Sequence, residues 1–261
     1  MNTEIIQTAF ITAYGKAFLQ GKAVSFEKNH PAALHYRNIR FVSKEPPFEQ
    51  LLLQDTIAKD PNAWFKYLAK EKTKQLHLVY QPLPEDVTKI DKSHSSIKAR
   101  NEWHIIAEKE NTMDIWLQKT VSENGEVMHY YYVIKGLEKR KIKVTSIDTT
   151  KLFLKEILSD LIKFTSTKEL ENWKNVFENA SLNLINENLS ELINKEYFPA
   201  DCYGLEAKQI FSAVDQAWVF GGMGSFSDVV QVNDYDLYQR LSANLYDTLC
   251  KSIASAINSY P

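Results

Sequence analysis

The residues best suited to chemistry lie in one glycine-dense turn near the C-terminus. Gly221, Gly222 and Gly224 are followed by Ser225, Ser227 and Asp228, and the chain has only eight glycines in all. Glycine permits positive φ and lets another backbone or a ligand approach closely. Successive free N–H groups, with two hydroxyl groups beside them, would form a nest for a phosphate or a carboxylate. The turn is therefore a candidate pocket for a small ligand.

The spacing of these glycines does not match the known phosphate-binding loops. A P-loop requires a Lys after its last glycine, and a dinucleotide-binding fold requires Gly-x-Gly-x-x-Gly between a strand and a helix; the sequence has neither. A simpler interpretation is a tight reversal between a helix that ends near Trp218 and a helix that starts near Asp234. We favour the reversal over the ligand nest.

A second candidate group lies on a predicted β-hairpin. Asn124-Gly125 stands between two alternating segments, which is typical of a two-residue type I′ turn. The resulting register puts Trp116, His129 and Tyr131 on one face, which we expect to be the outer one. These side chains would form a surface for a partner or a ligand. The alternative, which we favour, is that a helix covers Trp116, because aromatic side chains pack more often than they recognise.

The same register assigns the remaining pairs of the hairpin. One face is apolar except for Lys119, with the pairs Val121–Met128, Lys119–Tyr130, Leu117–Tyr132 and Ile115–Ile134. The other face is mixed, with the pairs Thr120–His129, Gln118–Tyr131, Trp116–Val133 and Asp114–Lys135. A one-residue slip would reverse both faces, so this register is a specific prediction.

Other catalytic or metal-binding patterns are missing from the sequence. There is no Cys-x-x-Cys and no His-Glu-x-x-His, and the six histidines are scattered, so we expect no metal and no cofactor. Cys202 and Cys250 suit reduced thiols, although one disulfide between them stays open. Four carboxylates surround the glycine turn and could perform acid–base chemistry, but helix capping explains them more simply; they are Asp215, Asp228, Asp234 and Asp236.

Composition limits the class of protein. The chain has 261 residues, 44% of them hydrophobic and 25% charged, which is typical of an ordinary globular protein. The formal charge of −2 supplies no bulk attraction for nucleic acid or anionic lipid, so we expect neither partner. The first residues lack the basic start of a signal peptide, and no apolar run approaches the length of a spanning helix. We therefore expect a cytoplasmic protein.

The elements that position these groups follow from periodicity. We expect a helix over 3–20, a short strand over 38–42, a helix after Pro47, and a helix from Asp60-Pro61 to about residue 72. Strands are expected over 76–80, 103–108, 113–121, the second arm of the hairpin and 142–147. We expect residues 82–101 to form a long loop that is either functional or mobile. We expect the side chain of His94, which lies within this loop, to be solvated.

Helical periodicity dominates the rest of the chain. A first helix from about Thr150 would bury Leu152, Phe153, Ile157 and Leu161, and further helices would follow up to the glycine turn. The last helix, with Asn233 as N-cap, would bury Leu241, Leu245, Leu249 and their neighbours, Tyr246 included. We predict an α+β fold: an antiparallel β-meander flanked and followed by helices, with a C-terminal helix-turn-helix packing on the core. Residues 1–148 would contain the sheet, and residues 149–261 would be mainly helical and packed with it as one unit.

The run from Ala217 to Asp228 resembles the C-terminal segment of several uncharacterised bacterial families. Some members of those families lie beside polymorphic toxin genes, where immunity proteins are common. Phe226 and Ser227 stand where those families usually have Trp and Asn, so no role of those side chains transfers to this chain. The resemblance implies a bacterial accessory protein rather than a particular reaction.

Three functions remain open on these grounds. We favour a non-enzymatic protein that binds another protein in the manner of an immunity protein. The alternative is a small-ligand binder or enzyme with a pocket at the turn from Gly221 to Asp228. A third function, as a module of a larger assembly, predicts a large exposed apolar patch.

Overall fold

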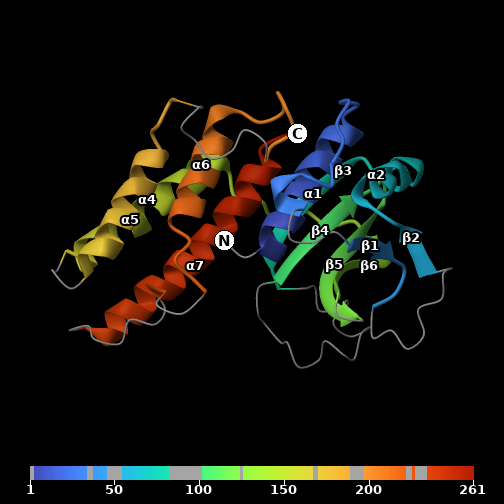
Figure 1. The fold of residues 1–261 in the computed structure, drawn as a ribbon. Coiled ribbons are helices and arrows are strands. Elements are labelled where there is room, and N and C mark those ends of the chain that lie inside the picture. The colour runs from blue at the N-terminus through green and yellow to red at the C-terminus, as the bar shows by residue number, and fades with distance from the viewer. Residues whose placement is uncertain are drawn as a thin grey trace. The chain divides into compact units, whose positions relative to one another are not determined.

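The computed structural model describes residues 3–33, 38–45, 55–82, 102–123, 126–166, 170–188, 197–221, 225–226 and 234–261. The chain folds as two compact units (Figure 1). The sheet unit comprises residues 3–143 and 196–199, and the helical unit comprises residues 144–195 and 200–260. The expected α+β class is confirmed, while the expectation that the helical region packs on the sheet as one unit stays a prediction.

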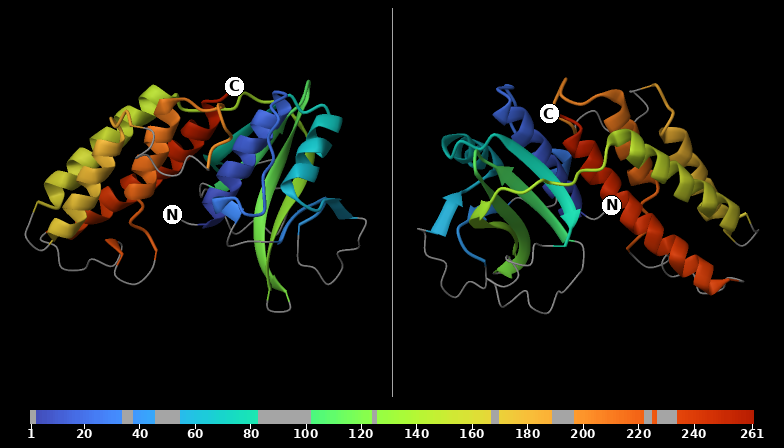
Figure 2. Two further views of the ribbon diagram at one scale, coloured as in Figure 1. Left: turned by 45° about the horizontal axis from the view of Figure 1, so that its top comes forward. Right: turned by 180° about the vertical axis from the view of Figure 1, so that it is seen from behind.

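The six described strands form one sheet in the order β2-β1-β6-β5-β4-β3. Their bounds are β1 (Asn38–Val42), β2 (Thr56–Ala58), β3 (Gln75–Gln81), β4 (Glu102–Glu108), β5 (Thr112–Glu123) and β6 (Glu126–Glu138). Strands β3 to β6 are antiparallel to their sequence neighbours. Figure 2 shows the strong twist of the long strands β5 and β6.

The sheet is mixed, which corrects the expected purely antiparallel arrangement. β1 lies parallel to β6, with Phe41 beside Tyr131, and antiparallel to β2. Parallel neighbours require a long crossover, and here the crossover contains β2 to β5 and a helix. The helix expected after Pro47 would contain Phe48, Leu51, Leu52 and Ile57. The first three lie outside the described residues, and Ile57 lies in strand β2, which is a further correction.

The predicted hairpin register is confirmed for seven of its eight pairs, from Val121–Met128 to Ile115–Ile134. The eighth pair, Asp114 with Lys135, is wrong, because β6 has one extra residue at this point and forms a β-bulge. Gly136 adopts φ +71°, which the bulge requires, and its N–H donates to Asp114 Oδ1 at 2.9 Å. The bulge thereby satisfies a carboxylate that is itself buried.

Two helices cover one face of the sheet. Helix α1 (Thr3–Leu19) packs on β3 and β4, and α2 (Pro61–Lys70) packs on β1 and β2, as Figure 1 shows. The predicted start of α2 is confirmed, with Asp60 accepting from Ala63 N at 2.8 Å and Pro61 in the first turn. Trp64 of α2 stacks on Phe41 at a ring separation of 4.5 Å. This contact joins the helix layer to the sheet.

The opposite face of the sheet is also buried and almost wholly apolar. It carries the predicted apolar face of the hairpin, extended by neighbouring strands: Val42, Val79, Ile106, Met113, Ile115, Leu117, Met128, Tyr130, Tyr132 and Leu137. Ile142 packs against this cluster from the segment after β6. That segment, residues 139–146, contains no strand, so the strand expected over 142–147 is wrong.

The helical unit contains four described helices: α4 (Ile147–Phe164), α5 (Glu171–Asn183), α6 (Leu205–Gln216) and α7 (Tyr235–Asn258). α4 packs on α5, α5 on α6, α6 on α7, and α7 on α4, so the four helices close a ring around their own core. Helix α7 begins one residue later than expected, because Asp234 rather than Asn233 is its N-cap and accepts from Leu237 N at 2.9 Å.

The buried side of α4 also differs from the predicted one. Leu154, Ile157, Leu158 and Leu161 face the core, whereas Leu152 and Phe153 are half exposed. Ser146 is the N-cap, so the helix starts at Ile147 and its first turn lies before the expected start. No described helix is both long and apolar enough to cross a membrane.

Candidate functional site

The hairpin residues expected to form a binding surface lie beneath the helices of the sheet unit. Trp116, His129 and Tyr131 all have an exposed fraction of 0%. Trp116 packs edge-on against Trp64 of α2 with ring centroids 5.3 Å apart. The expectation that His129 faces outward is therefore wrong, and the alternative in which a helix covers Trp116 describes the structure.

A hydrogen-bonded polar cluster joins α1 to this face of the sheet. Thr8 Oγ1 lies 2.9 Å from Tyr131 Oη and donates to Gln118 Oε1 at 2.8 Å. The amide of Gln118 donates to Gln7 Oε1 at 3.1 Å. His129 Nδ1 lies 3.0 Å from Thr120 Oγ1 and 3.2 Å from Gln118 Nε2. The structure thus unites two predicted site residues, His129 and Tyr131, with polar residues of α1.

Burial keeps both titratable side chains of this cluster, His129 and Tyr131, in their neutral forms. Burial lowers the pKa of His129 to about 4, although Glu4 opposes the shift, so the imidazole is neutral at pH 7. Burial raises the pKa of Tyr131 well above its ordinary value, so the phenol keeps its proton. Both side chains are fully enclosed, so in this structure they form hydrogen bonds with protein groups and are closed to a substrate. The cluster therefore orients α1 on the sheet.

A buried lysine makes a second polar contact between the same layers. Lys16 of α1 has an exposed fraction of 2%, and its Nζ donates to Leu76 O of β3 at 3.0 Å. Burial lowers the pKa of Lys16 to about 8. An amine with such a pKa is a potential nucleophile, but its enclosure between α1 and β3 keeps reactants away.

One half-buried ionic group at the end of the sheet was not anticipated from sequence. His77 Nε2 lies 3.3 Å from Glu108 Oε2, and Glu108 Oε1 accepts from Lys139 Nζ at 2.6 Å. Burial, with the charge of Lys16, lowers the pKa of His77. The pairing of His77 and Glu108 across β3 and β4 depends on a strand register that no motif encodes. Because Lys139 pairs with the same carboxylate, His77, Glu108 and Lys139 form an ion-pair network.

The glycine turn is only partly within the described residues. Gly221 is exposed with φ +94°, a conformation that favours glycine, and Ser225 is half-buried. Phe226 N donates to Val219 O at 3.1 Å, which closes the turn. Gly222, Gly224, Ser227 and Asp228 lie outside the described residues. The structure therefore supports a chain reversal at Gly221, and a ligand nest at the turn stays a prediction.

Phe226 anchors the turn in the core of the helical unit. Its ring contacts Trp173, Phe177 and Tyr238 with centroid separations of 5.4, 5.4 and 5.3 Å. The hydroxyl of Tyr238 donates to Phe226 O. Phe226 is thus fully buried, and its position in the core accommodates a large apolar side chain.

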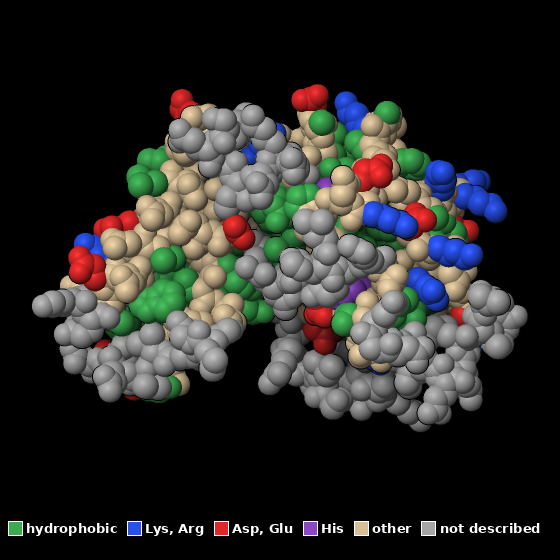
Figure 3. Space-filling view, viewed as in Figure 1, with side chains coloured by type: hydrophobic (Ala, Val, Ile, Leu, Met, Phe, Trp, Pro, Cys, Tyr) green, Lys and Arg blue, Asp and Glu red, His purple; other side chains and the backbone are tan. Residues whose placement is uncertain are grey.

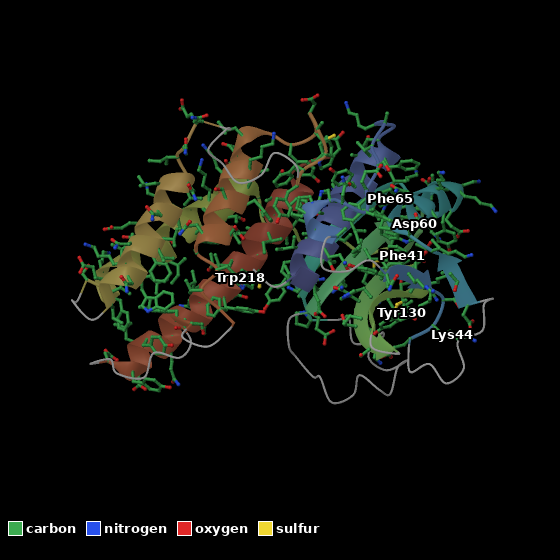
Figure 4. All side chains as sticks on the ribbon, in the orientation of Figure 1. Phe41, Lys44, Asp60, Phe65, Tyr130 and Trp218 are labelled. Carbon is green, nitrogen blue, oxygen red and sulfur yellow. The ribbon has the colours of Figure 1, made fainter. Side chains whose placement is uncertain are left out.

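Three aromatic rings meet on the surface beside the turn. Trp218 and Phe220 flank the buried Val219, and both contact Tyr246 of α7, with centroid separations of 5.7 and 5.2 Å. Trp218 and Phe220 lie 6.1 Å apart. Trp218 and Phe220 are half-buried, and Tyr246 is 37% exposed. We call these three residues the aromatic trio; Figure 4 shows Trp218 beside α7.

The trio was not predicted as a site. The sequence placed Tyr246 in the core face of the last helix, whereas the structure places it at the edge of that face. The sequence Trp218-Val219-Phe220 could have indicated part of the trio, because two aromatic residues alternate with an aliphatic one. In the structure Val219 is buried, whereas the two aromatic residues are half-buried. That signal does not identify Tyr246, because the contact depends on how α6 and α7 pack.

The carboxylates around the turn do not form one group in the described part of the chain. Asp234 caps α7, Asp236 is exposed in its first turn, and Asp215 is half-buried in the last turn of α6; Asp228 is not described. Burial raises the pKa of Asp215. Across the described ranges, no cluster of three or more His, Cys, Asp or Glu is arranged to hold a metal ion. Cys202 and Cys250 are both buried and are not joined in a disulfide.

Comparison of the chain with protein-family models, with curated proteins and with solved structures found no match.

Proposed function

We propose that this chain is a cytoplasmic, non-enzymatic accessory protein that acts by binding another protein, in the manner of an immunity protein. The aromatic trio is the observation that carries the proposal. Aromatic residues are more frequent in protein interfaces than on the rest of the protein surface, because Trp and Tyr supply a large contact area at a low entropic cost. Three rings in mutual contact at the surface make a ready-formed anchor for a partner.

The geometry of the trio supports recognition of a surface rather than of a small molecule. The ring centroids are separated by contact distances of 5.2 to 6.1 Å, so the rings fill the space between themselves. A partner would therefore cover the outer faces of the rings. Gly221 follows Phe220 directly, is exposed and has no side chain, so a partner backbone can approach closely there.

Other parts of the described chain favour binding over catalysis. The two predicted site residues with titratable groups, His129 and Tyr131, are closed off beneath α1 and neutral at pH 7. Lys16 is similarly enclosed. Further apolar side chains are exposed on the helical unit, namely Leu152, Phe153, Leu182 and Ile185, at 50 to 68%. Exposed apolar side chains of this kind are the groups that a protein partner covers.

A binding measurement on the products of the adjacent genes tests the proposal. The purified chain is titrated with each product in turn, and one of them is expected to bind. Trp218→Ala should weaken that binding at least tenfold, as expected for an aromatic anchor. Tyr235→Ala is the matched control for Tyr246→Ala, since both are exposed tyrosines on α7 and Tyr235 lies outside the trio.

Circular dichroism and thermal melting of each variant establish that it is folded. Binding by no adjacent product, together with tight binding of a small metabolite, would contradict the proposal. Equal loss of affinity in Tyr235→Ala and Tyr246→Ala would move the interface away from the trio.

A further inference from the structure

The trio belongs to the more acidic of the two units. The helical unit has nine Lys and Arg against 15 Asp and Glu, a formal charge of −6. The sheet unit has 22 Lys and Arg against 18 Asp and Glu, a formal charge of +4. The near-neutral charge of the whole chain therefore conceals a segregation of charge between its units. A field of this kind selects partners of opposite sign.

Figure 3 shows the same segregation on one face of the molecule. Lys and Arg side chains gather around α2 in the sheet unit and are sparser on the helical unit, while hydrophobic and acidic side chains occur on both. On α2, Lys66 and Lys70 are one turn apart and exposed. The binding surface built around the trio thus lies on the unit whose surroundings repel anions.

Carboxylates accompany the trio along both of its elements. Asp215 precedes Trp218 by one turn, and Trp218 N donates to Asp215 O at 3.3 Å. Asp215 is half-buried, and the positive charge of the N-terminal ammonium opposes the effect of burial on its pKa. Asp247 follows Tyr246 directly and pairs with Lys251 at 2.5 Å. Burial disfavours the charged form of Asp215, a cost that a cation brought by a partner would offset.

Aromatic rings attract cations over their faces. A Lys ammonium or, more often, an Arg guanidinium stacks on Trp or Tyr, and Trp is the best ring for this contact. The distances within the trio leave no room for a cation between the rings, so the contact must form on their outward faces. Rings that accept cations, together with a half-buried carboxylate on a unit of net negative charge, specify a basic rather than an acidic partner.

We propose that the aromatic trio binds a basic segment of a partner protein, in which an Arg or Lys side chain lies over the Trp218 or Tyr246 ring and pairs with Asp215. The proposal rests on the proposed function and names the partner's chemistry. A second copy of this chain, bound through its basic α2 face, is a different occupant that the test separates.

Selection from a random library of 12-residue peptides displayed on phage tests the proposal directly. The full chain is the target, and the Trp218→Ala chain removes peptides that bind elsewhere. We expect the surviving peptides to be enriched in Arg and Lys together with apolar residues. A synthetic peptide of the consensus sequence should then bind the wild-type chain at least tenfold more tightly than the Trp218→Ala chain.

Charge variants and salt identify the contribution of the carboxylate. Asp215→Asn should weaken the consensus peptide about threefold to tenfold, whereas Glu156→Gln on exposed α4, which removes the same charge elsewhere on the unit, should have less than a twofold effect. Raising NaCl from 50 to 500 mM should weaken binding several-fold, since exposed charge pairs are screened. Equal effects of Asp215→Asn and Glu156→Gln would overturn the specific pairing.

The two proposals fail in different ways. Trio-dependent peptides that are neutral or acidic, or whose binding ignores salt, would overturn the basic partner and leave protein binding standing. The absence of any trio-dependent peptide would overturn the basic partner, while the adjacent-gene measurement alone decides the function. Trp218-dependent dimerisation, detected by light scattering across concentrations, would replace the partner segment with a second copy of the chain.

Discussion

At the scale of single residues, burial in the sheet unit keeps two histidines in their neutral forms. His104 of β4 is fully buried on the apolar face, beside Val79 of β3 and Leu117 of β5. Burial lowers its pKa to about 4. His129 on the opposite face has a pKa lowered to about 4 as well, for the same reason. Both faces of the sheet therefore oppose protonation.

These shifts predict a loss of stability in mild acid. Between pH 6.5 and pH 4 the unfolded chain binds a proton at His104 that the folded chain excludes, so the free energy of unfolding falls as the pH is lowered through this window. For one such histidine the loss between pH 7.5 and pH 5 is about 2 kcal/mol. Above pH 7 this histidine contributes no pH dependence. Urea unfolding at a series of pH values measures the effect.

The variant His104→Leu is the control for this prediction. Leucine keeps an apolar side chain of similar size in the site but cannot bind a proton, so the pH dependence should become shallower by the amount that His104 contributes. The remaining slope should carry the contribution of His129. An identical pH profile in the variant and the wild type would contradict the assignment to His104.

At the scale of elements, the orientation of α1 depends on hydrogen bonds rather than on apolar contact alone. Thr8 and Tyr131 lie 2.9 Å apart and belong to elements more than a hundred residues apart in sequence. Buried polar groups are costly when they lose a partner, so a satisfied pair fixes one placement of the helix against others. This role explains why polar residues interrupt the otherwise apolar face of α1.

A double-mutant cycle tests this coupling. Tyr131→Phe and Thr8→Val should each lower the free energy of unfolding by about 1 to 2 kcal/mol, because each leaves the other hydroxyl without that partner. The double variant should lose less than the sum of the single variants, since it removes both polar groups. Chemical denaturation of the four proteins supplies the measurement. Additive losses would show that the two hydroxyls do not depend on each other.

Local signals predicted local structure well in this chain. The Asn124-Gly125 pair predicted the register from Val121 to Ile115, because a two-residue loop leaves no freedom in the pairing of the strands that it joins. Asp60-Pro61 marked the start of α2 because both residues act within one turn. The prediction failed at Asp114, where the extra residue around Gly136 acts only once the strands are paired.

Non-local contacts were beyond the reach of the sequence. The parallel strands β1 and β6 are not joined by a turn, so no local sequence motif predicts their pairing. Strand β2 has only three residues, which is too short for an alternating pattern to be recognised. Periodicity also cannot decide which apolar side chains become buried: it assigned Leu152, Phe153 and Tyr246 to the core, but the closed ring of helices leaves them at its outer edge. The aromatic trio was missed for the same reason.

At the scale of the whole molecule, the connection between β1 and β6 should govern the order of folding. More than eighty residues separate Val42 from Glu126, and closing so long a loop carries an entropic cost before its contacts form. Strands β4, β5 and β6 are joined by short turns and need no such closure. We expect the amides of β5 and β6 to gain protection before those of β1.

Pulse-labelling hydrogen exchange during refolding measures this order. Amides at Ile39 and Phe41 should become protected only after those at Ile115 and Leu117. The variant Gly136→Ala places a side chain at φ +71° and should slow the protection of both strands, because it strains the bulge on which their pairing depends. Protection of β1 before β5 would contradict the expected order.

The parallel strand pair also has a consequence during translation. Ribosomes add roughly 5 to 20 residues per second, so β1 is synthesised roughly 4 to 17 seconds before its neighbour β6. Throughout that interval the nascent strand has open edges that a foreign chain can join. Arg40 places a charge in the middle of the strand, where a foreign strand would have to pair. This charge opposes aggregation until β6 has been synthesised.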